Sequence, residues 1–181
     1  MENEAKVHKL FGIRCPLCGK DELTLNELEY NVKYFGKVIL LTEICKSCGF
    51  KHSDVYPLSS KEPCLIKARI ECVEDLSMKV VRSSSATIKI PEFGISVYPG
   101  PSSNGFISNV EGFLERIEEV IGFLRSTSND SEKKKRCDEL IEKIRRAKDG
   151  KIRFTIVIED LTGNSAIISE NSSKVEMKKL S

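Results

Sequence analysis

The chain has 181 residues, of which 40% are hydrophobic and 31% are charged, which is enough apolar material for a proper core in one domain or two small ones. Its 29 basic residues nearly balance its 27 acidic residues. The net charge of +2 therefore does not favour electrostatic binding to the phosphate backbone of a nucleic acid. No apolar run is long enough to span a bilayer, no export signal opens the chain, and the odd number of cysteines, seven, makes the reducing cytoplasm the expected setting.

The first recognisable pattern along the chain is a pair of Cys-x-x-Cys-Gly motifs, at residues 15–19 and 45–49. The two-residue spacer lets both sulfurs of one motif reach one metal ion, and the glycine permits the positive φ that turns backbone amides toward those sulfurs. Four thiolates close a tetrahedron around Zn²⁺ at about 2.3 Å per bond and leave no position for water or substrate. We therefore predict one structural Zn²⁺ ion, with the ligands Cys15, Cys18, Cys45 and Cys48.

A redox pair and a disulfide are the competing interpretations of these cysteines. A redox Cys-x-x-Cys normally stands alone at a helix start after a strand, whereas the two motifs here flank a strand-like stretch, which favours zinc. The other three cysteines, Cys64, Cys72 and Cys137, have no second cysteine at this spacing and follow apolar strand or helix patterns. We expect these three to be buried thiols.

Two strand-like segments separate the motifs. Residues 22–32 mostly alternate between apolar and polar, and residues 37–44 are rich in β-formers. The stretch Tyr34-Phe35-Gly36-Lys37 supplies the turn between them. We expect residues 1–60 to form a zinc ribbon, which has too little apolar area to fold without its metal.

After the second motif the chain continues in short strand-like segments. They cover residues 53–58, 64–73, 78–82, 86–90 and 95–98, with Pro, Gly, Ser and Asp between them. Strands at this density favour an antiparallel sandwich or rolled barrel over a parallel α/β sheet.

The apolar period then changes from two to 3.6 residues. One apolar stripe runs from Val110 to Leu124, and Ser108 with Glu111 forms a capping box, which predicts a helix from about Asn109 to Arg125. A second, narrower stripe predicts another helix that ends at Gly150.

The strand pattern returns at residues 152–159 and again at 166–168, so the two helices form a hairpin inserted within a β-rich domain. We assign this domain to residues 61–170, the helical hairpin to about 108–149, and a frayed tail to 171–181. The second helix is crowded with lysines and arginines, but the first carries several glutamates. Opposite charges on neighbouring helices explain this pattern without a nucleic-acid ligand.

Several segments, taken in order, resemble the Zpr family of zinc-finger proteins. They are both Cys-x-x-Cys-Gly motifs, the Tyr34 turn with its following strand, Arg82-Ser83, the Ala86–Gly94 stretch, Pro99-Gly100, Val110–Leu114 and the Asp160–Ser165 element. The resemblance covers about Ile13 to Ile168, and the order and spacing of the segments make it specific. With one pair of motifs and no internal repeat, the chain is similar to the single-module archaeal type.

The resemblance implies a mainly β (α+β) fold, with a small four-Cys zinc ribbon followed by a double-stranded β-helix-like domain that carries an inserted α-helical hairpin. It also implies a non-enzymatic adaptor or folding factor that binds a translational GTPase, elongation factor one-alpha.

The resemblance further points to residues of a shared surface or scaffold: Arg82, Ser83, Pro91, Glu92, Gly94, Gly100, Glu111, Gly163, Asn164 and Ser165. Turn geometry is a sufficient explanation for the glycines and the proline. Because it does not explain Arg82 and Glu92, we expect both to contact the partner. Reversing either charge should then weaken binding without lowering the melting temperature.

Two other classes of function compete with the adaptor. A nucleic-acid-binding zinc ribbon is supported by the zinc motif and the lysine run, but near-neutral charge and the lack of an aromatic stacking platform oppose it. A metalloenzyme would present several histidines and an acid to its metal, whereas this chain has only His8 and His52, neither in a ligand-like spacing with a carboxylate. We therefore expect no enzymatic activity.

Overall fold

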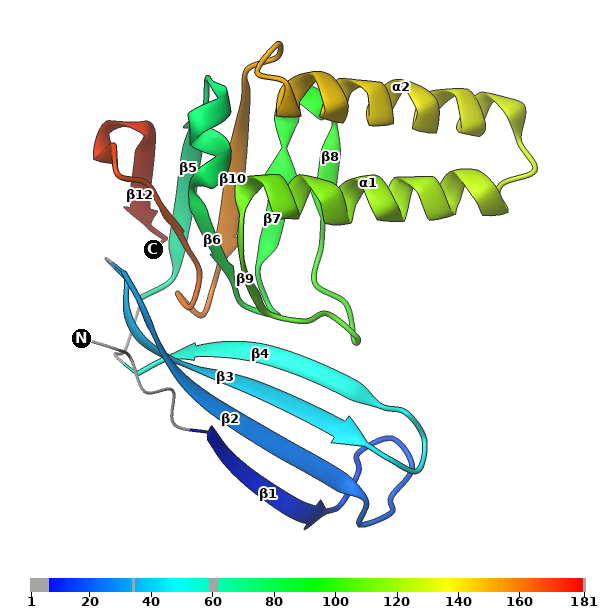
Figure 1. Ribbon diagram of the computed structural model, residues 1–181, viewed down its shortest axis with the longest axis vertical. Helices are drawn as coiled ribbons and strands as arrows, with labels where there is room; N and C mark the ends of the chain where they lie inside the picture. Colours follow the sequence, from blue (N-terminus) through cyan, green and yellow to red (C-terminus); the bar gives the residue numbers. More distant parts are fainter. Residues whose placement is uncertain (1–6, 34, 59–61, 181) are drawn as a thin grey trace.

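The computed structural model describes residues 7–33, 35–58 and 62–180. These residues form three antiparallel sheets, two long helices and three short 3-10 helices, which confirms the predicted mainly β (α+β) fold. Figure 1 shows one sheet in the lower part of the molecule and the remaining sheets with both helices above it. The predicted boundary between residues 60 and 61 lies outside the described residues.

The first sheet contains the zinc motifs. Its strands, in spatial order, are β1 (Val7–Ile13), β2 (Leu23–Val32), β3 (Gly36–Cys45) and β4 (Lys51–Pro57). β2 and β3 form a long hairpin, with Leu23 opposite Cys45 at one end and Val32 opposite Gly36 at the other. Gly36 has a φ of 101°, which favours glycine in this tight turn. Tyr34 of the predicted turn lies outside the described residues.

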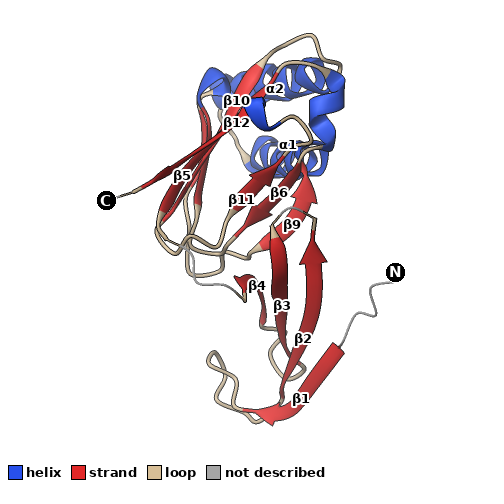
Figure 2. Ribbon diagram, turned by 90° about the vertical axis from the view of Figure 1, so that its left-hand side faces the viewer, coloured by secondary structure: helices blue, strands red, loops and turns tan. Residues whose placement is uncertain are grey.

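The second part of the chain is a sandwich of two sheets. Its strands are β5 (Cys64–Ile70), β6 (Lys79–Arg82), β7 (Thr87–Ile90), β8 (Ile95–Val97), β9 (Phe106–Asn109), β10 (Phe154–Asp160), β11 (Ala166–Ile168) and β12 (Val175–Lys179). One sheet has the order β12-β5-β10-β7-β8 and the other β11-β6-β9. Figure 2 shows strands of the two sheets, such as β5 and β6, in the upper part of the molecule. Ile66 and Ile156 of one sheet and Val80 of the other belong to one core. This antiparallel sandwich agrees with the strand density of the sequence.

The helical hairpin consists of α1 (Val110–Thr127) and α2 (Ser131–Lys148), inserted between β9 and β10. The cap of α1 differs from the predicted one, because the Asn109 side chain accepts the Gly112 amide at 2.8 Å and takes the place expected for Ser108. Gly150 follows α2 with a φ of 71° and donates its amide to the Ala147 carbonyl, as a helix end requires.

The charges of the two helices pair across the hairpin. Arg145 lies 2.9 Å from Glu118 and Lys148 lies 3.4 Å from Glu115, and Arg125 also pairs with Asp138. These contacts support the interpretation of the basic helix as complementary to its acidic neighbour. Helix α1 extends past the sheets (Figure 1), and Val120 and Leu124 in the far part of its apolar stripe are exposed.

The predicted frayed tail is wrong for the described part of residues 171–181. Residues 172–174 form a 3-10 helix, and β12 then pairs with β5, with Val175 opposite Ala68. As an edge strand, β12 has exposed polar side chains, so its sequence lacks the apolar alternation of a core strand.

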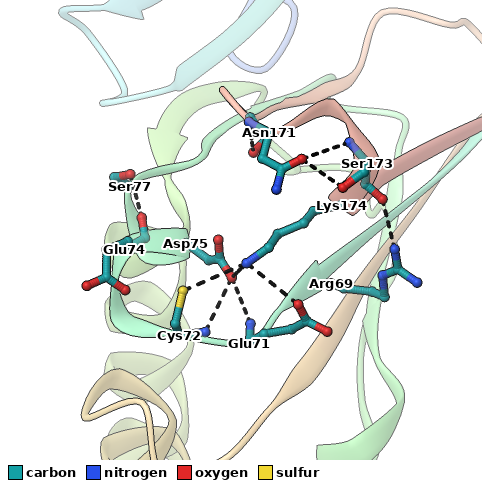
Figure 3. A network of polar contacts seen from close by, with 10 residues as sticks. Arg69, Glu71, Cys72, Glu74, Asp75, Ser77, Asn171, Ser173 and Lys174 are labelled. Carbon is teal, nitrogen blue, oxygen red and sulfur yellow. Dashed lines mark hydrogen bonds and ion pairs between the residues drawn. The ribbon is translucent and has the colours of Figure 1, made fainter.

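A polar network anchors this terminal segment (Figure 3). The Lys174 amino group lies 2.6 Å from the Asp75 carboxylate, which belongs to the 3-10 helix Val73–Ser77, and 3.6 Å from Glu71. Burial would raise the pKa of Asp75, but Lys174 and the amides of Glu71 and Cys72 hold it below its usual value. The network therefore ties the C-terminal strand to the start of the sandwich.

No helix among the described residues combines the length and the apolar character needed to cross a membrane.

Candidate functional site

The two Cys-x-x-Cys-Gly motifs form two loops with the same backbone geometry. In the first, the Gly19 amide donates to the Cys15 carbonyl at 2.9 Å, and in the second the Gly49 amide donates to the Cys45 carbonyl at 3.0 Å. The φ angles of Gly19 and Gly49 are 72° and 75°, in the left-handed region that glycine adopts without strain. The local sequence thus dictates two matching loops, as the spacing predicted.

The sheet brings these two loops to one place. Cys45 ends β3 opposite Leu23, where β2 leaves the first loop, and the side chains of Ile13, Leu23 and Phe50 pack around the cysteines. Cys15 and Cys45 are buried, Cys18 is half-buried and Cys48 is exposed. The metal centre therefore lies at the end of the first sheet where β2 begins and β3 ends, opposite the turn that joins these two strands.

The four sulfurs match a tetrahedral zinc site. Cys15 Sγ lies 3.7 Å from Cys48 Sγ, Cys18 Sγ lies 3.7 Å from Cys45 Sγ, and all four lie within 4.8 Å of one another. A tetrahedron with Zn–S bonds of about 2.3 Å has edges of about 3.8 Å, so the quartet fits the ion. The four cysteines form a structural Zn²⁺ site, and their donor set leaves no open coordination position.

The thiols depend on one another for deprotonation. Burial would raise the pKa of Cys15, but the backbone amides of Cys18 and Leu17 and the neighbouring thiols lower it to about 7. The Phe50 amide would lower the pKa of Cys48, but burial and the three other sulfurs raise it to about 12. The first thiolate is therefore stabilised by its neighbours, and the last forms only where a cation replaces the protons.

Four of the predicted partner-contact residues are buried: Arg82, Ser83, Gly163 and Ser165. Arg82 is 5% exposed and donates to the carbonyls of Asn104 and Ala86, at 2.9 and 2.8 Å. Ser83 and Ser165 are buried in the same region. Burial leaves Arg82 no surface to offer a partner, and reversing its charge would place a carboxylate near Asp54 and Asp160. A charge reversal at this position should therefore lower the melting temperature, contrary to the expectation from the sequence.

Ser83 and Ser165 meet at the buried carboxylate of Asp160. Ser83 Oγ donates to Asp160 Oδ2 at 2.9 Å, Ser165 Oγ to the same oxygen at 2.6 Å, and Thr162 to Asp160 Oδ1 through its amide and hydroxyl at 2.8 and 2.7 Å. Gly163, with a φ of 70°, makes the turn that returns the chain to this carboxylate. The Asp160–Ser165 segment is thus a buried structural motif of the sandwich.

The remaining predicted contact residues do not converge on one site. Pro91 begins the 3-10 helix Pro91–Phe93, Gly94 ends it with a φ of 65°, and exposed Glu92 accepts the Thr155 amide at 3.0 Å. Exposed Gly100 donates to Ser103 Oγ, exposed Glu111 lies in the first turn of α1, and Asn164 is half-buried beside the Asp160 network.

The sequence did not reveal the junction between the two parts of the protein. Asp54 of β4 is buried and accepts hydrogen bonds from the amide and hydroxyl of Ser84, which follows β6. Gly105 packs so closely on Asp54 that an added Cβ would lie 2.3 Å from Asp54 Oδ1, and its amide donates to Ser53 at 2.7 Å. No local pattern signals this contact, because its residues lie 30 or more positions apart in the chain.

Comparisons with known proteins add a family context to this geometry. A family model described as the ZPR1 jelly-roll domain matches residues 74–180. An uncharacterised ZPR1-like protein of Pyrococcus horikoshii is 42% identical over 184 aligned positions, which cover 98% of this chain and 81% of that protein. A second ZPR1-like protein, from Methanocaldococcus jannaschii, is 43% identical over 157 positions, 86% of this chain and 79% of that protein.

The zinc finger chaperone zpr1 of Schizosaccharomyces pombe is 31% identical over 157 positions. These positions cover 84% of this chain but only 33% of the fission yeast protein. The similarity to the archaeal proteins extends along most of both chains, whereas the eukaryotic protein has additional sequence.

Proposed function

Since this chain belongs to the ZPR1 family and is of its single-module archaeal type, we propose that it is a zinc-stabilised, non-enzymatic adaptor or folding factor for a translational GTPase, elongation factor one-alpha. The observation that carries this proposal is the similarity, over most of this chain, to a protein named a zinc finger chaperone. We place this activity in the cytoplasm, where reduced thiols remain available to zinc.

The site geometry supports a binding role over catalysis. The zinc ligands form a closed quartet, so this centre has no position at which substrate or water could coordinate. The carboxylates of Asp54 and Asp160 are buried and accept hydrogen bonds from the protein itself, which favours a structural role for both. We therefore assign the zinc to the stability of the ribbon and recognition to the surrounding surface.

The domain assignment follows from the same proposal. We assign residues 1–60 to the ribbon and the sandwich to the remainder, with the hairpin at 108–149, and we extend the sandwich beyond residue 170 to include β12. Glu92 and Glu111 are exposed and are the candidates for partner contact that remain among the charged residues.

A direct binding experiment tests the function. Zinc-loaded, tagged protein is used to capture partners from a lysate of its own cells, with GDP or GTP held constant, and the captured GTPase is then purified for calorimetry. Enrichment of elongation factor one-alpha, with binding lost after the zinc is removed, is the expected result.

The same assay decides the nucleic-acid alternative, which the exposed lysines at the start of α2 favour. Enrichment of ribosomal RNA, with affinity that falls steeply between low and moderate salt, would replace the adaptor by a nucleic-acid-binding protein.

A further inference from the structure

One face of the first sheet carries apolar and acidic side chains on β2 and β3. The register of β2 and β3 pairs Leu25 with Glu43, Glu27 with Leu41, and Glu29 with Ile39. Cross-strand partners share a face, and so do alternate residues of one strand, so these side chains alternate on a single face. We call the following set the acidic ribbon face: Leu25, Glu27, Glu29, Ile39, Leu41 and Glu43.

The other face of this sheet packs on apolar residues of the sandwich, while Asp54 of β4, opposite Leu41 on the acidic ribbon face, bonds to Ser84 at the edge of that face. Val32, Val38 and Val55 lie on that other face and pack with Val81 and Ala166 of the sandwich. In contrast, the apolar members of the acidic ribbon face are only half-buried and belong to none of the core clusters formed by the described residues. Figure 1 shows the sheet extending away from the sandwich, with no helix against it.

The acidic ribbon face also carries basic side chains, because His8 lies opposite Glu27, His52 lies opposite Glu43, and Lys37 lies two residues before Ile39. Among the described residues, no ion pair involves Glu27, Glu29 or Glu43. Glu27 lies diagonal to Glu43, about 7–8 Å away in an antiparallel sheet, so these two like charges repel each other, whereas Glu29 lies diagonal to Leu41 and Lys37. Tyr56 lies opposite Ile39 on the same face. Its burial and the nearby carboxylates of Asp54 and Glu43 raise the pKa of its phenol.

We propose that the acidic ribbon face is the docking surface for a basic amphipathic helix of a protein partner. A sheet buries an apolar face against another element, and a helix with an apolar stripe flanked by lysines or arginines would cover the leucines and isoleucine while its cations meet the glutamates. Among the described residues of this face the three glutamates outnumber the one lysine, and an excess of carboxylates repels phosphate, so nucleic acid does not fit here.

The zinc centre holds this surface in shape. Leu23 and Cys45 are the next cross-strand pair on the same face, and both are buried against the cysteine cluster. Loss of the metal would release the strands β2 and β3 at that end and disperse the face. This inference rests on the proposed adaptor function and adds to it the place and chemistry of partner contact.

The test uses full-length, zinc-loaded protein and a synthetic helical peptide of about 18 residues, with leucines on one stripe and lysines on both flanks. A peptide with glutamates in place of the lysines is the control ligand. The lysine peptide should bind, protect amides of β2 and β3 from hydrogen exchange, and bind about tenfold more weakly to E27K/E43K. The matched control E119K/E139K reverses two exposed glutamates of the hairpin and should change the affinity less than about twofold.

Three results would overturn the proposal: no binding of the lysine peptide, protection confined to other elements, or equal weakening in E27K/E43K and E119K/E139K. If E27K/E43K binds less than one zinc, E27Q/E43Q replaces it, and an unchanged affinity would then also reject the proposal. Capture of elongation factor one-alpha by the wild-type protein is measured separately. Its failure counts against the proposed function, while the peptide result decides the docking surface.

Discussion

Replacing Asp160 by asparagine changes one atom of a side chain that is fully buried in the sandwich. Asp160 Oδ1 accepts both bonds from Thr162, and the asparagine oxygen can keep them. The new amide nitrogen takes the place of Oδ2 and faces two hydroxyls, of Ser83 and Ser165, that both donate to that position. The substitution therefore breaks two hydrogen bonds to a charged acceptor.

The expected loss of stability follows from these two bonds. At about 1.5 kcal/mol each, the low end for charged acceptors, D160N should lower the free energy of unfolding by about 3 kcal/mol. For a protein of this size that corresponds to a fall in melting temperature of roughly 6–12 °C. Urea unfolding and calorimetry at pH 7 measure both quantities. S85A, which removes an exposed hydroxyl 3.5 Å from the same carboxylate, is the control and should cost less than about 1 kcal/mol.

The effect of D160N should depend on pH in one direction. Burial would raise the pKa of Asp160, but hydrogen bonds from Ser165, Thr162 and Ser83 hold it below its usual value. A carboxylate with a depressed folded pKa contributes its stability above the unfolded pKa of about 3.9 and loses it as the pH falls through the folded value. The gap between wild type and D160N should thus be constant from about pH 5 to 7 and shrink below about pH 4. A gap under about 1 kcal/mol at pH 7 would refute the reasoning.

Three further changes test other contacts. G105A should lower the free energy of unfolding by about 2–3 kcal/mol, because its Cβ would meet Asp54 Oδ1 at 2.3 Å. The control G122A has open space around its Cβ in α1 and should be neutral or raise the free energy of unfolding by up to about 1 kcal/mol. Urea unfolding compares the two variants, and equal effects would contradict the close packing at Gly105. K174A should expose β12 to proteolysis and hydrogen exchange before the rest of the sandwich, and unchanged protection would mean that the Lys174 network is dispensable. Because Asp75 raises the pKa of Lys174, that contribution should be present below the unfolded pKa of about 10.4 and disappear as the pH rises through the higher folded value, which denaturation at alkaline pH can check.

The zinc ligands could be predicted because their information is local. Each Cys-x-x-Cys-Gly motif fixes its own loop, and a single hairpin register then brings the two loops together. The long stripe of α1 and the alternation of β10 are likewise local patterns, and both elements were found near their predicted positions. The helix cap was missed by one residue, since Ser108 and Asn109 are both good capping residues and only the structure selects Asn109.

Features that depend on distant contacts could not be predicted. The charge of Arg82 suggested a surface position, but the side chain is buried. It donates to two backbone carbonyls and lies near the carboxylates of Asp54 and Asp160. The first strand, Val7–Ile13, lies at the edge of its sheet, where both its apolar and its polar side chains are exposed. Its sequence therefore shows no clear alternation of apolar and polar residues. The Asp54 junction joins residues of different elements, so neither partner has a recognisable pattern of its own.

Metal analysis combined with chelation tests the central claim most directly. We expect one zinc ion per chain, and removal of the ion by a strong chelator should abolish hydrogen-exchange protection in β2 and β3 while the sandwich strands β5 and β10 stay protected. A protein that binds far less than one zinc, or whose first sheet keeps its protection after chelation, would contradict the account.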